Sequence, residues 1–213
     1  SMILEQRSRV ADAAIFCDFG YGMITTGLLN RSLPALRQNV PILAADVSGQ
    51  RGNLLQFRNV DLLCPTEREV RAALNDYESG LSAAAWQTLH LTQARHIFVT
   101  LEKRGLVAFE RRSQERATLE WEGRLKGEQL PSFARYATDR LGCGDALLAV
   151  SALALTAGAG LMQSAYMGNV AAAIEIDMLG NHPVDFDSYA RWLRNRCELE
   201  QSETMPEPAP TAF

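Results

Sequence analysis

Two glycines and an acid between residues 142 and 145 form the arrangement in this chain that is best suited to chemistry. The segment reads Gly142-Cys143-Gly144-Asp145 and runs directly into the apolar stretch 146–157. Glycines let a backbone turn tightly and approach a ligand, and the first amides of a helix are unpaired donors with partial positive charge. Such a turn could bind the oxygens of a transferring phosphoryl group. Asp145, in the first helical turn, could then accept the proton of an attacking hydroxyl.

A purely structural interpretation of this segment is also open. Asp is among the residues preferred at the start of a helix, so Asp145 could be an ordinary cap behind a glycine turn. Taken alone, a Gly-x-Gly-Asp tetrapeptide favours that interpretation. The surrounding elements are therefore needed to choose between the two.

Short apolar runs alternate with helical patterns along the chain, which implies βαβ units and a mostly parallel sheet with helices on both faces. Strands are expected near 13–17, 41–46, 61–64, 96–100 and 106–109, and helices near 25–36, 66–74, 82–93, 146–157, 161–178 and 186–197. Residues 111–139 are polar and read as irregular, with one short strand expected at 118–121. The helix at 146–157 is apolar all round, which predicts burial on every side. Ligands of such sheets bind beyond the carboxyl ends of the strands, where Asp18, Asp46, Thr66 and Thr100 are expected.

The segment 139–145 resembles the signature of PfkB/ribokinase-type carbohydrate kinases, which reads Asp-Thr-x-Gly-Ala-Gly-Asp before a buried helix. Other stretches are similar to motifs of that family and follow in the family's order. They are Asp18-Phe19-Gly20-Tyr21-Gly22, which is similar to a motif of the heptose-phosphate kinase branch, Asp46-Val47-Ser48-Gly49, Pro65-Thr66-Glu67-Arg68-Glu69, Val99-Thr100 with Gly105, and Asn169 with Ala171, Ala172 and Gly180. Six matches in order over residues 13–185 are hard to ascribe to chance.

The resemblance implies a ribokinase-like α/β fold and ATP-dependent phosphorylation of a sugar or sugar phosphate. It implies Asp145 as the catalytic base and Gly142, Cys143 and Gly144 as the anion hole. It further implies that Glu69 helps to hold Mg²⁺ through water, that Thr100 and Gly105 border the triphosphate of ATP, and that Asn169 and Gly180 lie near the adenine. The family's amino-terminal part and lid should precede this chain, and we expect that missing part of the same protein to be a partner.

Three of these assignments have a structural alternative. Glu69 could be a solvated acid in the first turn of a helix, where acids are favoured. Thr100 could simply end a strand, and Asn169 could serve only packing within an Ala-rich helix.

The chain also departs from the family pattern. Glu102 falls where the phosphate loop usually has Ser or Gly, and its charge would repel ATP unless it points away. The other departures are Thr66 for Asn, Arg140-Leu141 for the hydroxyl-bearing pair, Cys143 for Ala and Tyr21 for Lys. These changes favour a second hypothesis, a catalytically degenerate domain that binds a nucleotide or acts as a scaffold. An NAD-binding domain is disfavoured, because no Gly-x-Gly-x-x-Gly follows the first strand.

Composition limits the remaining possibilities. A net charge of -4 over 213 residues argues against a nucleic-acid partner. Four scattered cysteines fit a reducing cytoplasm, and the longest apolar stretch, 146–157, is too short to span a membrane. Residues 1–200 are expected to form the carboxy-terminal, nucleotide-binding portion of the domain, and the Pro- and Glu-rich residues 201–213 a disordered tail. A homodimer is possible, and the isolated chain is expected to be inactive because the sugar-binding residues precede it.

Overall fold

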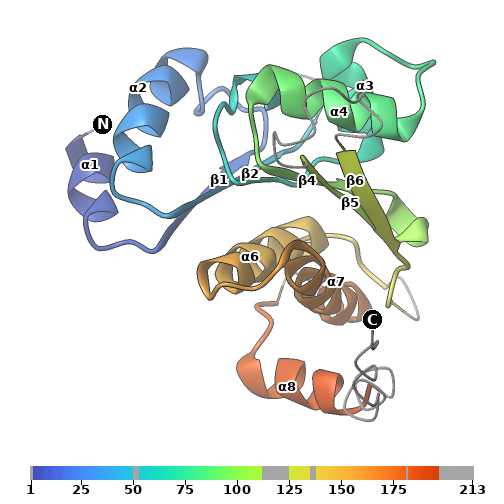
Figure 1. Cartoon of the computed structure of the whole chain (residues 1–213). Coiled ribbons are helices and arrows are strands. Elements are labelled where there is room, and N and C mark those ends of the chain that lie inside the picture. The colour runs from blue at the N-terminus through green and yellow to red at the C-terminus, as the bar shows by residue number, and fades with distance from the viewer. Residues whose placement is uncertain (1, 50–52, 112–124, 135–137, 181, 197–213) are drawn as a thin grey trace, which may run out of the picture.

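A single six-stranded sheet organises the chain, as a computed structural model shows (Figure 1). The structure describes residues 2–49, 53–111, 125–134, 138–180 and 182–196. The strands follow one another in chain order and are β1 (Ala13–Asp18), β2 (Ile42–Val47), β3 (Leu62–Leu63), β4 (His96–Thr100), β5 (Leu106–Arg111) and β6 (Leu125–Leu130). β1 to β4 are parallel, whereas β5 and β6 are added in antiparallel fashion. The carboxyl ends of the four parallel strands therefore share one edge of the sheet.

Helices cover both faces of this sheet, which confirms the predicted architecture (Figure 1). On one side lie α2 (Thr26–Arg37), α3 (Glu67–Leu74) and α4 (Leu81–Thr92), and on the other lie α6 (Cys143–Thr156) and α7 (Leu161–Asp177). The remaining helices are α1 (Met2–Ser8) beside α2, α8 (Phe186–Arg194) beyond α7, and two short 3₁₀ turns, η1 (Leu54–Gln56) and η2 (Glu102–Arg104). None of the described helices is long and apolar enough to cross a membrane.

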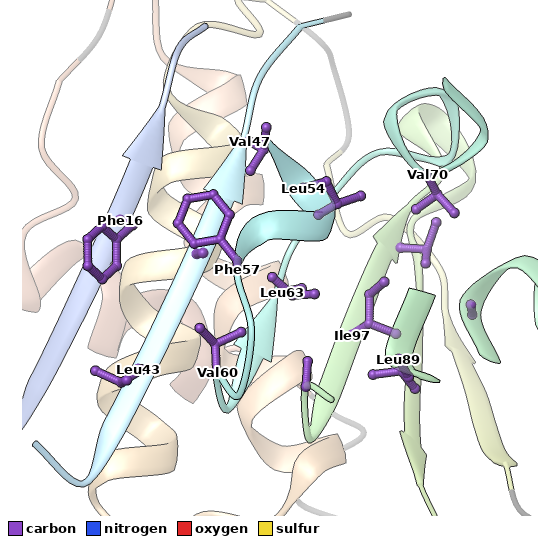
Figure 2. Close-up of a cluster of buried hydrophobic side chains, with 14 of the residues drawn as sticks. Phe16, Leu43, Val47, Leu54, Phe57, Val60, Leu63, Val70, Leu89 and Ile97 are labelled. Atoms are coloured by element: carbon purple, nitrogen blue, oxygen red, sulfur yellow. The ribbon is translucent and has the colours of Figure 1, made fainter. Parts of the chain in front are cut away.

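Two hydrophobic clusters hold these layers together, one on each face of the sheet. Figure 2 shows the first, in which Phe16 and Phe57 pack near Leu43, Leu63 and Ile97 between the strands and the first group of helices. The rings of Phe16 and Phe57 meet edge to face with their centroids 5.7 Å apart. In the second cluster, side chains of the sheet such as Ala44, Leu62, Phe98 and Ala108 meet Leu148 and other residues of α6 and α7. Burial of these apolar surfaces is what fixes α6 beneath the sheet.

Local sequence signals explain where several helices begin. Thr25 accepts a hydrogen bond from the amide of Leu28 at 3.2 Å, as expected for the cap of α2. Thr66 and Glu69 form a reciprocal capping box at the start of α3.

Two expectations from the sequence were wrong or incomplete. Leu153 in α6 is 63% exposed, so this helix is not buried on every side; it contacts the sheet on one side and α7 on another, and Leu153 faces neither. β6 was not expected, because residues 111–139 read as irregular. Its burial pattern shows why: only Leu125 of its six residues is buried, so no apolar alternation marks it. The strand predicted at 118–121 and the tail at 201–213 lie outside the described residues.

Helices α6 and α7 approach each other closely at Gly168. A Cβ added to this glycine would lie 2.7 Å from the carbonyl oxygen of Leu147 and would overlap the hydroxyl of Ser151. Ser151 is fully buried and donates to the carbonyl of Ser164 at 3.1 Å, so it cannot easily move away. The contact fixes the position of α7 relative to the amino-terminal half of α6.

We therefore expect Gly168→Ala to lower the free energy of unfolding by about 2 kcal/mol, a typical cost of overpacking. Gly27→Ala is the matched control, because its nearest neighbour would be Thr25 Oγ1 at 4.0 Å and Ala favours helix. Urea unfolding of the wild type and both variants measures this difference. Equal stability of Gly168→Ala and Gly27→Ala would show that the helices are not so tightly joined.

Candidate active site

A cavity of about 750 Å³ lies beyond the carboxyl ends of the central strands. The ends of β2 and β4 and the β4–β5 turn border it on one side, and the start of α6 and the middle of α7 on the other. Six of the residues predicted for the site line this cavity: Glu69, Thr100, Gly105, Cys143, Gly144 and Asn169. Gly142, Asp145 and Gly180 do not line it, although Gly142 and Asp145 directly flank residues that do. The functional roles given to these residues remain predictions.

The turn before α6 has the backbone geometry that an anion hole requires. Gly142 is the N-cap and has φ +86°, a left-handed conformation that favours glycine, and it carries no side chain that could occupy the first amides of the helix. Asp145 lies in the first turn and is not the N-cap. The alternative in which Asp145 is an ordinary cap is therefore wrong.

Asp139 fixes the conformation of this turn from outside the cavity. Its Oδ1 accepts the amide of Leu141 at 3.0 Å, and its Oδ2 accepts the amide of Gly180 at 3.2 Å. These amides hold the pKa of Asp139 below its usual range. Gly180, which has φ +84°, contacts Asp139 through its amide and does not line the cavity. Its predicted place beside the adenine gains no support from this contact.

Three carboxylates gather near the amino terminus of α6. Burial, and then the neighbouring charges of Glu69 and Asp145, raise the pKa of Asp46 to about 7. Sequence reasoning gave Asp46 no role in the site, although its position at the end of a strand was visible. Burial and the carboxylates of Asp145 and Asp46 likewise raise the pKa of Cys17 to about 11, with its thiol hydrogen-bonded to Asp145. A neutral thiol is therefore the neighbour of the predicted base.

Glu69 has a structural role whether or not it also binds a metal. Its Oε2 accepts the amide of Thr66 at 2.8 Å, and its Oε1 accepts the amide of Gly49 at 3.0 Å. The carboxylate thus joins the start of α3 to the turn after β2. Because it also lines the cavity and each oxygen keeps a free lone pair, it could still accept hydrogen bonds from the water shell of a metal ion.

Backbone contacts hold both sides of the cavity, at Gly105 and Thr100 on the sheet side and at Asn169 on the helix side. A Cβ on Gly105, which has φ +89°, would lie 2.6 Å from the amide nitrogen of Ser132, so only glycine fits there. Asn169 donates to the carbonyl of Pro131 at 2.7 Å from a nearly buried position in α7. Thr100 closes β4 and donates its amide to the carbonyl of Pro65 at 3.0 Å. Each residue therefore has a structural role as well as a place at the cavity.

Two of the departures from the family pattern meet at this cavity. Arg140 Nη1 lies 3.6 Å from Glu102 Oε2, and both residues line the cavity. Glu102 is therefore not directed away from the site, but a cation compensates for its charge.

Comparison with known proteins identifies the family and the fold. The profile of the pfkB family carbohydrate kinases matches residues 33–182, and the chain belongs to this family. Among curated relatives, it is 27% identical over 177 residues to the bifunctional protein HldE of Pelobacter propionicus, covering 81% of this chain and 33% of that protein. It is 28% identical over 184 residues to HldE of Geobacter metallireducens, covering 84% and 34%. The chain thus spans about a third of the length of these relatives.

Solved structures show the same fold. The structure of Arabidopsis thaliana ribokinase complexed with ribose and ATP matches with a TM-score of 0.71 at 20% identity, over 91% of this chain and 59% of that one. Escherichia coli phosphofructokinase-2 in complex with potassium matches with a TM-score of 0.70 at 16% identity, over 91% and 60%. The predicted ribokinase-like fold is confirmed, and the chain corresponds to part of it.

The raised pKa of Asp46 predicts a pH-dependent stability. The Asp46 carboxyl group binds its proton more tightly in the folded state than in the unfolded state. The free energy of unfolding should therefore fall as pH rises from about 4 through 7. Asp46→Asn removes the charge and keeps an acceptor for the amide of Val47, and should stabilise the fold by about 2 kcal/mol at pH 8 and by little at pH 4.

Chemical denaturation at both pH values measures this difference, with the exposed Asp12→Asn as control. A stability gain for Asp46→Asn that is the same at pH 4 and pH 8 would contradict the prediction.

Proposed function

We propose that this chain supplies the nucleotide site and the catalytic base of an ATP-dependent phosphotransferase that acts on a hydroxyl of a sugar or sugar phosphate. The observation that carries the proposal is the left-handed turn at Gly142, which starts α6 beside the cavity without a side-chain cap and places Asp145 in the first turn. Family membership supports the coarser conclusion, that of a carbohydrate kinase.

In the proposed reaction, the nucleotide occupies the 750 Å³ cavity with its base toward α7 and its phosphates toward the start of α6. Asp145 removes the proton of the acceptor hydroxyl, whose oxygen then bonds to the γ-phosphorus as the bond to ADP breaks. The amides of Cys143 and Gly144 stabilise the charge on the transferring phosphoryl oxygens. The neutral thiol of Cys17 lies beside Asp145 and adds no charge to the site.

The residues of the cavity also fit Mg²⁺. Within the residues that the structure describes, no group of three or more His, Cys, Asp or Glu side chains forms a metal cage. Mg²⁺ usually keeps several waters and binds through one or two carboxylates and the phosphates of the substrate, and it neutralises phosphate charge when bound. Glu69 and Asp46 are the oxygen donors that line the cavity at a suitable place. Binding of Mg-ATP would also favour the ionised form of Asp46.

The choice of sugar, in this proposal, belongs to the amino-terminal part of the protein. Exposed apolar side chains near β1 support the docking of such a part: Ile15 is 40% exposed, Phe19 53%, Met23 85% and Tyr21 93%. Among the described strands, β1 pairs with β2 alone, so one of its edges is free to accept another strand or a second copy of this chain. The isolated chain should then show little or no turnover, and its site should act in the cytoplasm, where single reduced cysteines persist.

A second candidate is a degenerate domain that binds a nucleotide or a partner without catalysis. The substitutions at Thr66, Glu102, Arg140 and Leu141 favour it. The two candidates differ in the activity of the complete protein: a degenerate domain would bind Mg-ATP without transferring phosphate to any sugar.

We expect the chain to bind Mg-ATP with a Kd near 1 mM, a free energy of about -4 kcal/mol. Gly142→Val should abolish binding, because Val disfavours the left-handed conformation of this position and would close the turn. Asp145→Asn should bind as well as the wild type or slightly better, because it removes a negative charge near the γ-phosphate. Thermal-shift titration with Mg-ATP measures all three proteins.

Gly158→Val is the control for backbone strain, because Gly158 has φ +88° at the far end of α6 and its Cβ would meet open space. It should lose stability but keep its response to Mg-ATP. The proposal would be rejected if Gly142→Val retained wild-type binding, or if the complete protein neither bound Mg-ATP nor phosphorylated a sugar.

A further inference from the structure

The ion pair between Arg140 and Glu102 joins two segments that are far apart in the sequence. Arg140 lies before the turn of α6, and Glu102 lies in η2 after β4. Their closest charged atoms are 3.6 Å apart, and the two side chains are 57% and 75% exposed. An exposed pair of this kind contributes little free energy, so it can be broken at small cost.

The backbone on the Arg140 side of the pair is firmly held. The flanking amides of Asp139 and Leu141 are both bonded, to Ile176 O at 3.2 Å and to Asp139 Oδ1 at 3.0 Å, and the carbonyl of Arg140 accepts the thiol of Cys143 at 3.1 Å. Movement of the guanidinium is therefore a rotation of its own side chain.

The backbone that carries Glu102 is equally constrained. The amide of Gly105 donates to the carbonyl of Glu102 at 3.1 Å, and the amide of Leu101 donates to the carbonyl of Gly105 at 2.7 Å. Glu102 itself has φ +52°, a left-handed conformation that non-glycine residues adopt rarely. Both charged groups thus sit on fixed supports at the edge of the same cavity.

The cavity has few cations with which to bind a polyphosphate. Its lining holds the carboxylates of Asp46, Glu69 and Glu102, and only Lys103 and Arg140 as cationic side chains among the described residues. Arg104, the next cation along the chain, is held by Glu67 at 3.0 Å and does not line the cavity. A guanidinium offers paired donors that match phosphate oxygens, and Arg140 lies directly beside the proposed anion hole.

We propose that Arg140 is a polyphosphate-binding residue whose guanidinium leaves Glu102 for the phosphates of the nucleotide. Glu102 then limits how tightly the nucleotide binds, because it competes with the phosphates for the same cation. This inference rests on the proposed nucleotide site, and it assigns a joint role to two residues that depart from the family pattern.

Isothermal titration of the full chain with Mg-ATP tests the proposal, with magnesium tripolyphosphate as a second probe that keeps the metal and lacks the nucleoside. Arg140→Gln should weaken binding of both probes about tenfold, the loss of one charge-assisted contact. Glu102→Gln should tighten binding about threefold. In the double variant, Glu102→Gln should tighten binding by a smaller factor, because it then relieves only the direct repulsion between Glu102 and the phosphates.

Arg104→Gln and Glu128→Gln are the matched controls, since they make the same charge changes outside the cavity, at side chains that are 69% and 43% exposed. Each should change Kd less than about twofold, because neither residue lines the cavity and each is already paired with an opposite charge, Arg104 with Glu67 and Glu128 with Lys126. If Arg104→Gln and Arg140→Gln raised Kd by similar factors, Arg140 would act only through the net charge of the protein, and the proposal would be overturned.

The remaining outcomes separate this inference from the proposed function. Binding of Mg-ATP that is unchanged by Arg140→Gln overturns the inference and leaves the nucleotide site standing. Binding of tripolyphosphate that depends on Arg140, without binding of Mg-ATP, supports Arg140 as a polyphosphate ligand and counts against the kinase site. Failure of the wild type and of Glu102→Gln to bind either probe rejects both. If Glu102→Gln tightens binding by the same factor in the wild type and in Arg140→Gln, Glu102 does not compete with the phosphates for Arg140, and the proposal is overturned.

Discussion

The placement of the amino terminus of α6 is the constraint on which the rest of the site depends. The left-handed turn at Gly142 starts the helix without a side-chain cap, and Asp139 holds that turn through the amides of Leu141 and Gly180. The body of α6 is fixed by the apolar cluster beneath the sheet and by its contact with α7 at Gly168. Fold stability and the geometry of the proposed anion hole are thus produced by the same contacts, and a shift of this helix would move both the amides and Asp145.

The electrostatics of the cavity explain why it would need a cation to bind an anion. Asp46 and Glu69 line it and Asp145 stands beside it; burial, and then the charges of Glu69 and Asp145, favour protonation of Asp46. Unbalanced charge of this kind costs stability in the empty protein, which is common at functional sites. Mg²⁺ bound with a nucleotide would reverse the balance, because the carboxylates would then face positive charge. The proposed site is therefore complementary to the metal–nucleotide complex and much less so to the free nucleotide.

Much of the fold followed from the sequence, because apolar strands that end in Asp or Thr and helices with Thr25 or Thr66 caps carry strong local signals. The order of six motifs identified the family, and most of the predicted site residues line one cavity. β6 was missed because its residues are mostly exposed and show no alternation. The raised pKa of Asp46 and the pairing of Arg140 with Glu102 could not be predicted, since both depend on segments brought together only by folding.

The central claim is that the first amides of α6 bind the phosphates of a nucleotide, and backbone NMR tests it most directly. Titration of ¹⁵N-labelled chain with Mg-ATP should shift the amide resonances of Cys143 and Gly144 more than those of Leu161 and Met162, the first residues of α7. Those amides also begin a helix behind a glycine, Gly160, and their helix start does not border the cavity. Saturable shifts confined to the start of α6 and to the cavity walls would agree with the account. Equal shifts at both helix starts, or none at Cys143 and Gly144 while the nucleotide binds elsewhere, would contradict it.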